Sequence, residues 1–331
     1  MNEPKSWKEW ERDLIELDQK LAQLKERLAV ATPEEQAKHH ESIAQAEARR
    51  DRYIEHTYKK LTNWKKVLVA RADPRPYTLD YIKTLFTDFV ELQGDRRFGT
   101  DNAIIGGPAD YKGQPVMIVG HQKGRNIQER QQRNFAMAKP EGYRKAIRLF
   151  EMADRFSMPI ITFIDTPAAD PGVESESRGI SEAIAASILS MFALKVPVVS
   201  VVIGEGGSGG AIGIGIGNKV LMQEHAIYSV IPPEGCAAIL WRDAALGPQA
   251  SHALRLTAQD ALTFGLVDEI IAEPKGAAHR SPTEAAALVE KAIDAAMDSL
   301  KGLSGEELKQ QRHKKFRAMG QFGGAVSSSL F

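Results

Sequence analysis

A dense run of glycine follows a short apolar segment late in the chain, and it restricts the possible folds more than any other feature. Eight of the 27 glycines lie between positions 204 and 217, directly after the β-branched run Val198 to Ile203. Glycine loses more conformational entropy on folding than any other residue, so such a density needs a reason: positive φ, close helix packing, or a backbone that must touch a ligand. We therefore expect a functional site where this strand ends.

Short apolar runs alternate with helical patterns after residue 73, and they predict an α/β fold. The runs are 116–119, 160–164, 198–203, 220–222 and 227–231. Strands this short and this apolar are typical of parallel sheets buried on both faces.

Two of these runs begin alike, Met158-Pro159-Ile160-Ile161 and Val196-Pro197-Val198-Val199, and 181–194 fits a crossover helix between them. A strand, a helix and a second strand of this length form a βαβ unit. The repeated phrase indicates either a duplicated unit or chance similarity between two buried strands.

The first 70 residues have a different pattern, which predicts a helical hairpin. Large apolar residues recur at heptad spacing, at Trp7, Trp10, Leu14, Leu17, Leu21, Leu24 and Leu28. Such a seam must pack against another helix. Thr32-Pro33-Glu34-Glu35 has the form of a helix start and predicts a second helix over about 34–66. The hairpin either closes on itself, which we favour because short antiparallel pairs are common, or clasps a partner subunit.

The length of the chain predicts more than one domain, and its charge balance argues against one class of protein. A chain of 331 residues allows about two domains. We expect a helical hairpin at 1–70, a sheet-containing domain at 71–300 and a basic helix or tail at 301–331. The 43 Lys and Arg balance 43 Asp and Glu, which argues against a chain-wide polybasic nucleic-acid binder.

Cysteine content and hydropathy predict a cytoplasmic protein. Cys236 is the single cysteine, which excludes an internal disulfide and any zinc site built from several cysteines of this chain. The N-terminus lacks the apolar core of a signal peptide, and no apolar run approaches the roughly 18 residues that span a membrane. We expect no bound metal and no membrane contact.

Positive charge is concentrated between residues 112 and 148, where nine Lys or Arg face two acids. Lys123 and Arg125 lie on a glycine-flanked loop after the 116–119 strand, and such loops bind ligands in α/β proteins. We expect these two to contact a phosphate-bearing substrate or an acidic carrier. A solvated helix face is the favoured interpretation of four of the remaining seven, Lys139, Arg144, Lys145 and Arg148.

Three chemistries compete for the glycine run. Gly204, Gly206 and Gly209 satisfy the G-x-G-x-x-G of a dinucleotide site, but this match is weak because a strand follows so soon. A Walker loop is excluded because no Gly-Lys-Ser/Thr follows. An oxyanion hole of adjacent backbone N–H groups at a helix start needs no side chain.

Conventional catalytic groups form no recognisable constellation. His121 and His225 are isolated, Asp165 ends a strand without an evident partner, and Cys236 has no histidine motif near it. Structural roles are the favoured interpretation of all four. A site rich in N–H donors without an evident general base points to enolate or ureido chemistry, in which substrate or cofactor carries the proton.

Seven motifs in order give the chain a specific resemblance. They are GDRRFGTD at 94–101, GHQKGRN at 120–126, RNF at 133–135, PEGYRKA at 140–146, IITFIDTP at 160–167, IGEGGSGGA at 203–211 and PEGCAAILW at 233–241. Together they resemble the α subunit of bacterial acetyl-CoA carboxylase carboxyltransferase, from the N-terminal hairpin to about residue 290.

The resemblance implies a fold and an assembly. The fold would be crotonase-like, a spiral of ββα units as in ClpP and crotonase, here with an N-terminal helical hairpin. The assembly would be an α2β2 heterotetramer, active only with its β subunit and working with biotin carboxylase and a biotin carboxyl carrier protein. The β chain would supply a zinc ribbon and most of the CoA site.

The resemblance also implies a reaction, the first committed step of fatty acid synthesis. The carboxyl group would move from carboxybiotin on the carrier to acetyl-CoA, giving malonyl-CoA, with CO2 release, proton removal by the biotin ureido anion and attack of the enolate. In this family the glycines after the EG pair, here Gly206 and Gly207, are assigned to the biotin carbonyl, and a second oxyanion hole lies on the partner chain.

A loop beside the predicted site departs from the family's usual pattern. The positions that would approach biotin are Ala168, Ala169, Asp170, Pro171 and Gly172. Ala168 stands where the family usually has glycine, Asp170 where it has an aromatic residue, and Ile180 where glutamine is common. The reaction class does not depend on these residues.

Other functions remain open at this point. One is a carboxyltransferase or decarboxylase for another acyl-CoA, and another is a nicotinamide enzyme that uses Gly204, Gly206 and Gly209. The basic tail offers a third, nucleic-acid binding through residues such as Lys309, Arg312 and Arg317, but a solvated terminal helix is the favoured interpretation.

Overall fold

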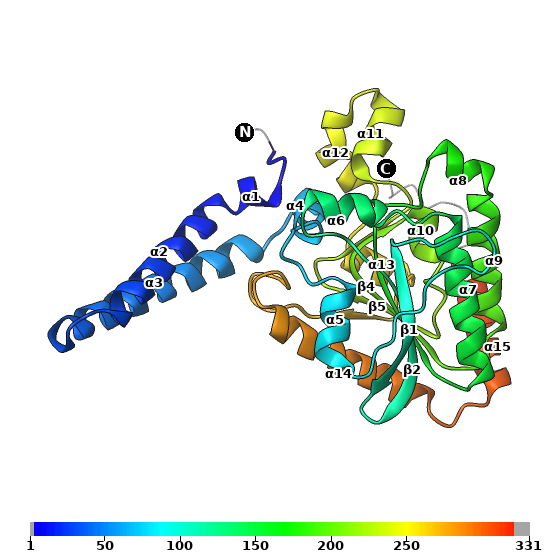
Figure 1. The fold of residues 1–331 in the computed structure, drawn as a ribbon. Coiled ribbons are helices and arrows are strands. Elements are labelled where there is room, and N and C mark those ends of the chain that lie inside the picture. Colours follow the sequence, from blue (N-terminus) through cyan, green and yellow to red (C-terminus); the bar gives the residue numbers. More distant parts are fainter. Residues whose placement is uncertain (1–2, 321–331) are drawn as a thin grey trace.

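The computed structural model describes residues 3–320, and a mixed seven-stranded sheet forms its centre (Figure 1). The strand order is β1-β2-β3-β4-β5-β7, with β6 paired to β4. Only β1 and β2 pair antiparallel, as a hairpin, and the other pairs are parallel. The strands are β1 Ile104–Tyr111, β2 Gln114–His121, β3 Ile160–Thr166, β4 Val198–Gly207, β5 Lys219–Gln223, β6 Ile227–Ser229 and β7 Glu269–Ile271.

The five apolar runs of the sequence are confirmed as strands, and the repeated phrase begins two neighbours. Ile160 of β3 pairs with Val198 of β4 in parallel register, and the crossover helix α9 spans Ile180–Ala193. The predicted βαβ unit is therefore present. Sequence analysis did not identify β1, whose Gly106-Gly107-Pro108 interrupts the apolar pattern.

Helices cover both faces of the sheet, as expected for strands buried on both sides. One face packs on α7 (Pro140–Arg155) and α9, through side chains such as Leu149 and Met191. The other packs on α5 (Thr78–Leu85) and α14 (Pro282–Leu300), through Tyr81 and Ile293. Strand residues alternate between these two cores, which fixes the register of the sheet.

The N-terminal helices form an arm that projects from the body (Figure 1). Helix α2 (Arg12–Ala29) packs along α3 (Pro33–Tyr58), with Leu14 and Leu21 of the heptad seam buried. The capping box of Thr32 and Glu35 is present. The predicted second helix is too long, because α3 ends at Tyr58 and Thr62 caps a separate helix, α4 (Asn63–Ala70).

Helix α4 belongs to the body rather than to the arm. Trp64, Val67 and Leu68 are buried in a third cluster together with Ile227 of β6 and Leu256. The arm therefore connects to the sheet through a short apolar helix. A division of the chain at residues 70 and 300 stays a prediction.

Two predictions about basic residues are wrong. The sequence predicts Lys145 on a solvated helix face, but on α7 its side chain is buried and donates to the carbonyl of Asp101 at 2.6 Å. The sequence predicts Arg312 on a solvated terminal helix, but on α15 (Gly305–Arg317) it is fully buried and donates to the carbonyls of Val196 and Leu194. Both cations donate to backbone carbonyls that lie between elements: Asp101 precedes β1, and Leu194 and Val196 lie between α9 and β4.

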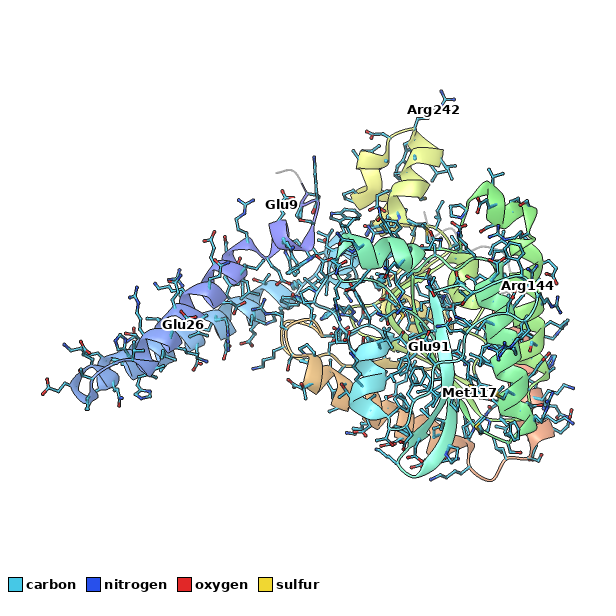
Figure 2. All side chains as sticks on the ribbon, in the orientation of Figure 1. Glu9, Glu26, Glu91, Met117, Arg144 and Arg242 are labelled. Carbon is cyan, nitrogen blue, oxygen red and sulfur yellow. The ribbon has the colours of Figure 1, made fainter. Side chains whose placement is uncertain are left out.

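The remaining helices are short and lie mostly at the strand ends. They are α1 Trp7–Trp10, α6 Ile127–Gln132, α8 Val173–Ser177, α10 Ser208–Ile212, α11 Pro233–Trp241, α12 Gly247–Ala253 and α13 Ala258–Thr263, with 3-10 turns at Asn134–Ala136 and Ala244–Leu246. Arg242 lies at the tip of the projecting α11–α12 segment, whereas Met117 lies within the body (Figure 2). No helix in the described part of the chain is long and apolar enough to cross a membrane.

Candidate active site

The glycine pair lies where a strand becomes a helix. Gly206 and Gly207 are the last two residues of β4, and Gly207 caps the five-residue helix α10. Gly206 is flanked on both sides, by Thr166 of β3 and Tyr228 of β6. Ser208, the next residue, has φ of 53°, a left-handed conformation that is costly for a residue other than glycine. The chain therefore turns abruptly directly after the pair.

Contact with neighbouring backbone is the reason that Gly207 has no side chain. Its φ of −95° is open to any residue, so the conformation does not require glycine. A Cβ atom there would instead collide with the carbonyl of Pro167. At Gly206 a Cβ atom would lie 2.6 Å from Cδ2 of Tyr228 and 3.1 Å from the carbonyl oxygen of Ile227. Both positions require a bare backbone.

The predicted biotin loop lies beside the glycine run. A Cβ atom on Gly210 would lie 2.7 Å from the backbone of Ala168 and Ala169, so the loop and α10 are in direct contact. The Thr166 hydroxyl donates to the carbonyl of Ala168 at 2.7 Å, and the Asp170 N–H donates to Ala138 at 3.0 Å. The structure thus brings together two segments that sequence analysis had selected separately.

The second half of this loop carries its own polar contacts. The Ser175 hydroxyl donates to the Asp170 carboxylate at 2.5 Å, and Pro171 is exposed next to half-buried Gly172. Asp170, the least usual residue of the loop, therefore holds the start of α8. Asp170 is thereby linked to α8 (Val173–Ser177), the element that follows the loop.

A buried ion network adjoins the glycine pair through Glu205, the residue that precedes Gly206. Lys123 Nζ is 2.6 Å from Asp165 Oδ1 and 3.0 Å from Glu205 Oε1. The other oxygen of Glu205 lies 2.7 Å from Nε of Arg71, which also pairs with Glu234 of α11. The side chains of Asp165 and Glu205 are 1% and 8% exposed. No local sequence motif marks this cluster, because its members come from the end of α4, from β3, β4 and α11, and from the loop after β2.

The network fixes the protonation of its central members. Burial would raise the pKa of Glu205, but Arg71 and Lys123 hold that pKa down at about 2. Burial would likewise lower the pKa of Lys123, but the two carboxylates raise it above its usual range. Glu205 is therefore a carboxylate and Lys123 an ammonium at neutral pH.

Lys123 and Arg125 both have protein partners. Lys123 belongs to the network, while the Arg125 guanidinium stacks on Tyr77 and donates to Asp80 and to the carbonyl of Arg75. Contact with a substrate phosphate or a carrier stays a prediction for both.

The isolated candidates of the sequence differ in their surroundings. Asp165 has Lys123 and the Glu205 N–H as partners, so the expectation that it lacks one is wrong. Burial lowers the pKa of His121 to about 3, and neither of its ring nitrogens has a hydrogen-bond partner among the described residues. His225 is buried and Cys236 half-buried. Residues 3–320 hold no group of three His, Cys, Asp or Glu placed to bind a metal.

A small cavity opens beside the network and a strained turn borders it. The cavity has a volume of about 180 Å³, and Lys123, Glu205, Pro167 and Phe135 line part of it. Asn134, Phe135 and Ala136 all have positive φ, of 44°, 54° and 62°. Three consecutive left-handed residues other than glycine are costly, and such strain gathers at functional sites. The turn carries the RNF motif, but the residue types in this motif do not predict positive φ angles.

The dinucleotide interpretation of the glycine run lacks its helix. A dinucleotide fingerprint opens the helix of a βαβ unit, whose N-terminus binds the pyrophosphate. Here α10 has five residues, Ser208–Ile212, and β5 begins at Lys219. The geometry therefore favours the oxyanion interpretation.

Sequence comparison finds close relatives of one kind. A family model described as acetyl co-enzyme A carboxylase carboxyltransferase-like matches residues 7–320. The acetyl-CoA carboxylase carboxyl transferase subunit α of Sorangium cellulosum is 51% identical over 315 residues, covering 95% of this chain and 98% of the relative. The subunit of the same name from Thermus thermophilus is 49% identical over 314 residues, again 95% of this chain and 98% of the relative.

Solved structures share the fold at low sequence identity. A transcarboxylase 12S crystal structure with methylmalonyl-CoA bound matches 77% of this chain and 44% of its own, with a TM-score of 0.55 and 19% identity. A Pseudomonas malonate decarboxylase hetero-tetramer in complex with coenzyme A matches 65% of this chain and 86% of its own, with a TM-score of 0.54 and 14% identity. The predicted crotonase-like fold is confirmed.

Proposed function

Because the chain belongs to the family of acetyl-CoA carboxylase carboxyltransferase α subunits, we propose that it moves a carboxyl group from carboxybiotin to acetyl-CoA. The product is malonyl-CoA, which supplies fatty acid synthesis. The observation that carries the proposal is the glycine pair at the end of β4, where bare backbone meets a helix start. Family membership over residues 7–320 supports the same reaction.

Gly206 and Gly207 stabilise the negative charge that develops on the biotin carbonyl when CO2 leaves. Preorganised N–H donors lower such a barrier without reorganisation, and loss of one typically costs about 10² to 10³ in rate. The positive end of the α10 backbone adds to the field at this point. The family's co-substrate supplies the carboxyl group and the proton acceptor, so the chain needs no general base of its own.

The loop from Ala168 to Gly172 forms one wall of the biotin pocket. It contacts the glycine run directly at Ala168 and Ala169, which supports this placement. Asp170 and Pro171 lie farther along the same loop, half-buried and exposed respectively. The unusual Asp170 accepts a hydrogen bond from Ser175 of α8.

The enzyme works as a complex with other subunits. Exposed apolar side chains crowd the segment that follows β6, namely Val230, Ile239, Leu240 and Trp241, with Ile239 72% exposed. Apolar surface of this kind marks an interaction site. We assign a β subunit to complete the CoA site and to carry any zinc, in an α2β2 heterotetramer served by a biotin carboxyl carrier protein and biotin carboxylase.

The forward reaction tests the substrate. The chain is co-expressed with the β subunit of its host, and the purified complex is supplied with carboxylated carrier protein and acetyl-, propionyl- or butyryl-CoA. We expect carboxylation of acetyl-CoA with a kcat/KM at least tenfold above the longer thioesters. Preference for another acyl-CoA would overturn the substrate assignment, and quenching or enhancement of NADH fluorescence by the complex would revive the dinucleotide alternative.

A further inference from the structure

The residue immediately before the glycine pair is held at three atoms. The Glu205 N–H donates to Asp165 Oδ1 at 2.9 Å, its Oε1 lies 3.0 Å from Lys123 Nζ, and its Oε2 lies 2.7 Å from Arg71 Nε. The peptide that leads into Gly206 is therefore tightly constrained.

This restraint coincides with an irregularity in the sheet. Ile164 of β3 pairs with Val202 of β4, but Thr166 pairs with Gly206, so β4 advances four residues while β3 advances two. The Asp165 carboxylate fills this irregular segment, and Gly204 provides room for it, since a Cβ atom there would collide with Asp165. A side chain thus replaces the regular ladder beside Glu205. Such irregularities re-aim the residues next to them.

The network also places charged side chains in a buried region, where apolar side chains are usual. Lys123 and Arg71 bring two positive charges against Asp165 and Glu205 in a largely buried site. Burial of charges costs so much desolvation that well-packed apolar residues often give equal or greater stability. Four ionisable side chains gathered at this point indicate a role in fixing one geometry.

We propose that Glu205 is a positioning residue whose carboxylate, clamped by Lys123 and Arg71, fixes the orientation of the Gly206 and Gly207 backbone for the developing oxyanion. The inference rests on the proposed function, because the proposed reaction is what places a developing negative charge next to the Gly206 and Gly207 backbone. Glu205 does not touch the reacting atoms and acts through the glycine pair. A displacement of about 1 Å at such a donor can cost about 10²-fold in rate.

Glu234 offers a matched control within the same network. It pairs with Arg71 at 2.5 Å from α11, yet it does not contact the backbone that leads to the glycines. Both residues are glutamates bound to the same guanidinium. Replacement of either by glutamine removes one negative charge next to Arg71, but only Glu205→Gln weakens the clamp on β4.

The test compares three variants in the assembled α and β complex, by steady-state kinetics and thermal unfolding. We expect Glu205→Gln to lower kcat by about 10- to 100-fold with KM for acetyl-CoA within about twofold, and Glu234→Gln, which leaves every contact of Glu205 in place, to lower kcat by about tenfold less than Glu205→Gln does. Lys123→Met covers the case in which Glu205→Gln fails to assemble. Lys123→Met should lower kcat and leave KM for acetyl-CoA unchanged. A raised KM that no longer depends on salt concentration, with kcat unchanged, would show that Lys123 contacts a substrate phosphate instead and would overturn the inference.

Two further results separate the inference from the proposed function. Equal loss of kcat in Glu205→Gln and Glu234→Gln, or unchanged kcat in Glu205→Gln, would overturn the positioning role while wild-type turnover still supports carboxyl transfer. A wild-type complex without turnover would overturn the proposed function and, with it, the role of Glu205.

Discussion

Replacement of Gly207 by alanine tests the oxyanion site with the smallest possible change. The added Cβ atom collides with the carbonyl of Pro167, while the backbone angles themselves suit alanine. The end of β4 must therefore move away from β3, which displaces the N–H donor. Loss of such a donor costs about 10² to 10³ in rate, or about 3 to 4 kcal/mol in transition-state stabilisation.

Gly209→Ala is the matched control for this substitution. It lies in the same run, but its Cβ atom would meet only the side chain of Ile184, with Cδ1 at 3.3 Å. Both complexes are assayed for malonyl-CoA formation at saturating acetyl-CoA, after gel filtration shows assembly. We expect kcat to fall at least about 100-fold for Gly207→Ala and less than about threefold for Gly209→Ala. Near-normal kcat in an assembled Gly207→Ala complex would refute the role of this backbone.

Three other predictions concern stability. His121 is buried and neutral with a pKa of about 3, so the folded chain loses stability as pH falls below about 6.5, where the unfolded chain takes up the proton. Between neutral pH and pH 5 this loss of stability amounts to about 2 kcal/mol, or about 3 °C in Tm for a chain of 331 residues. His121→Leu should abolish that part of the decline in Tm. Equal pH dependence of Tm for variant and wild type in calorimetry would contradict the prediction. Leu14→Ala should cost the arm about 2 to 5 kcal/mol, seen as faster hydrogen exchange in α2 and α3 but not in the sheet; unchanged exchange in the arm would show that the seam contributes little. Arg75 Nη2 lies 2.6 Å from Glu273 Oε1, and both side chains are buried. Arg75→Met leaves this carboxylate without its cation and should cost about 3 to 5 kcal/mol in urea unfolding at pH 7, whereas a wild-type midpoint would show that the carboxylate finds another partner.

Strand positions and the crossover helix follow from local sequence because each depends on near neighbours. Burial on both faces requires unbroken apolar runs, and these runs identified five of the seven strands. The hairpin was readable from its heptad seam and capping box for the same reason. The end of its second helix was not, because Thr62 restarts a helix that packs on the sheet rather than on the arm.

The ion network shows what local sequence cannot reveal. Asp165 and Lys123 each follow a strand, and only the parallel arrangement of β2, β3 and β4 brings their side chains to Glu205. A lone charged residue at a strand end carries no sign of its partner. The same holds for Lys145 and Arg312, whose burial depends on carbonyl groups of distant elements.

The loop from Ala168 to Gly172 is predictable from the sequence only in part. Its approach to the glycine run follows from its position after β3, since the carboxyl ends of parallel strands meet at one edge of a sheet. The contact of Gly210 with Ala168 and Ala169 is a tertiary feature that the sequence leaves unspecified. Family motifs locate the site, whereas packing determines its geometry.

The most direct test of the proposed reaction is transfer of a labelled carboxyl group in the reverse direction. Malonyl-CoA labelled in its free carboxylate is incubated with biocytin and the purified α and β complex, and label in biocytin is measured against acetyl-CoA formed. The account predicts equimolar labelled carboxybiocytin and acetyl-CoA, with no transfer by either subunit alone. Release of the label as CO2 without dependence on biocytin, or retention of all label in malonyl-CoA, would contradict carboxyl transfer by this protein.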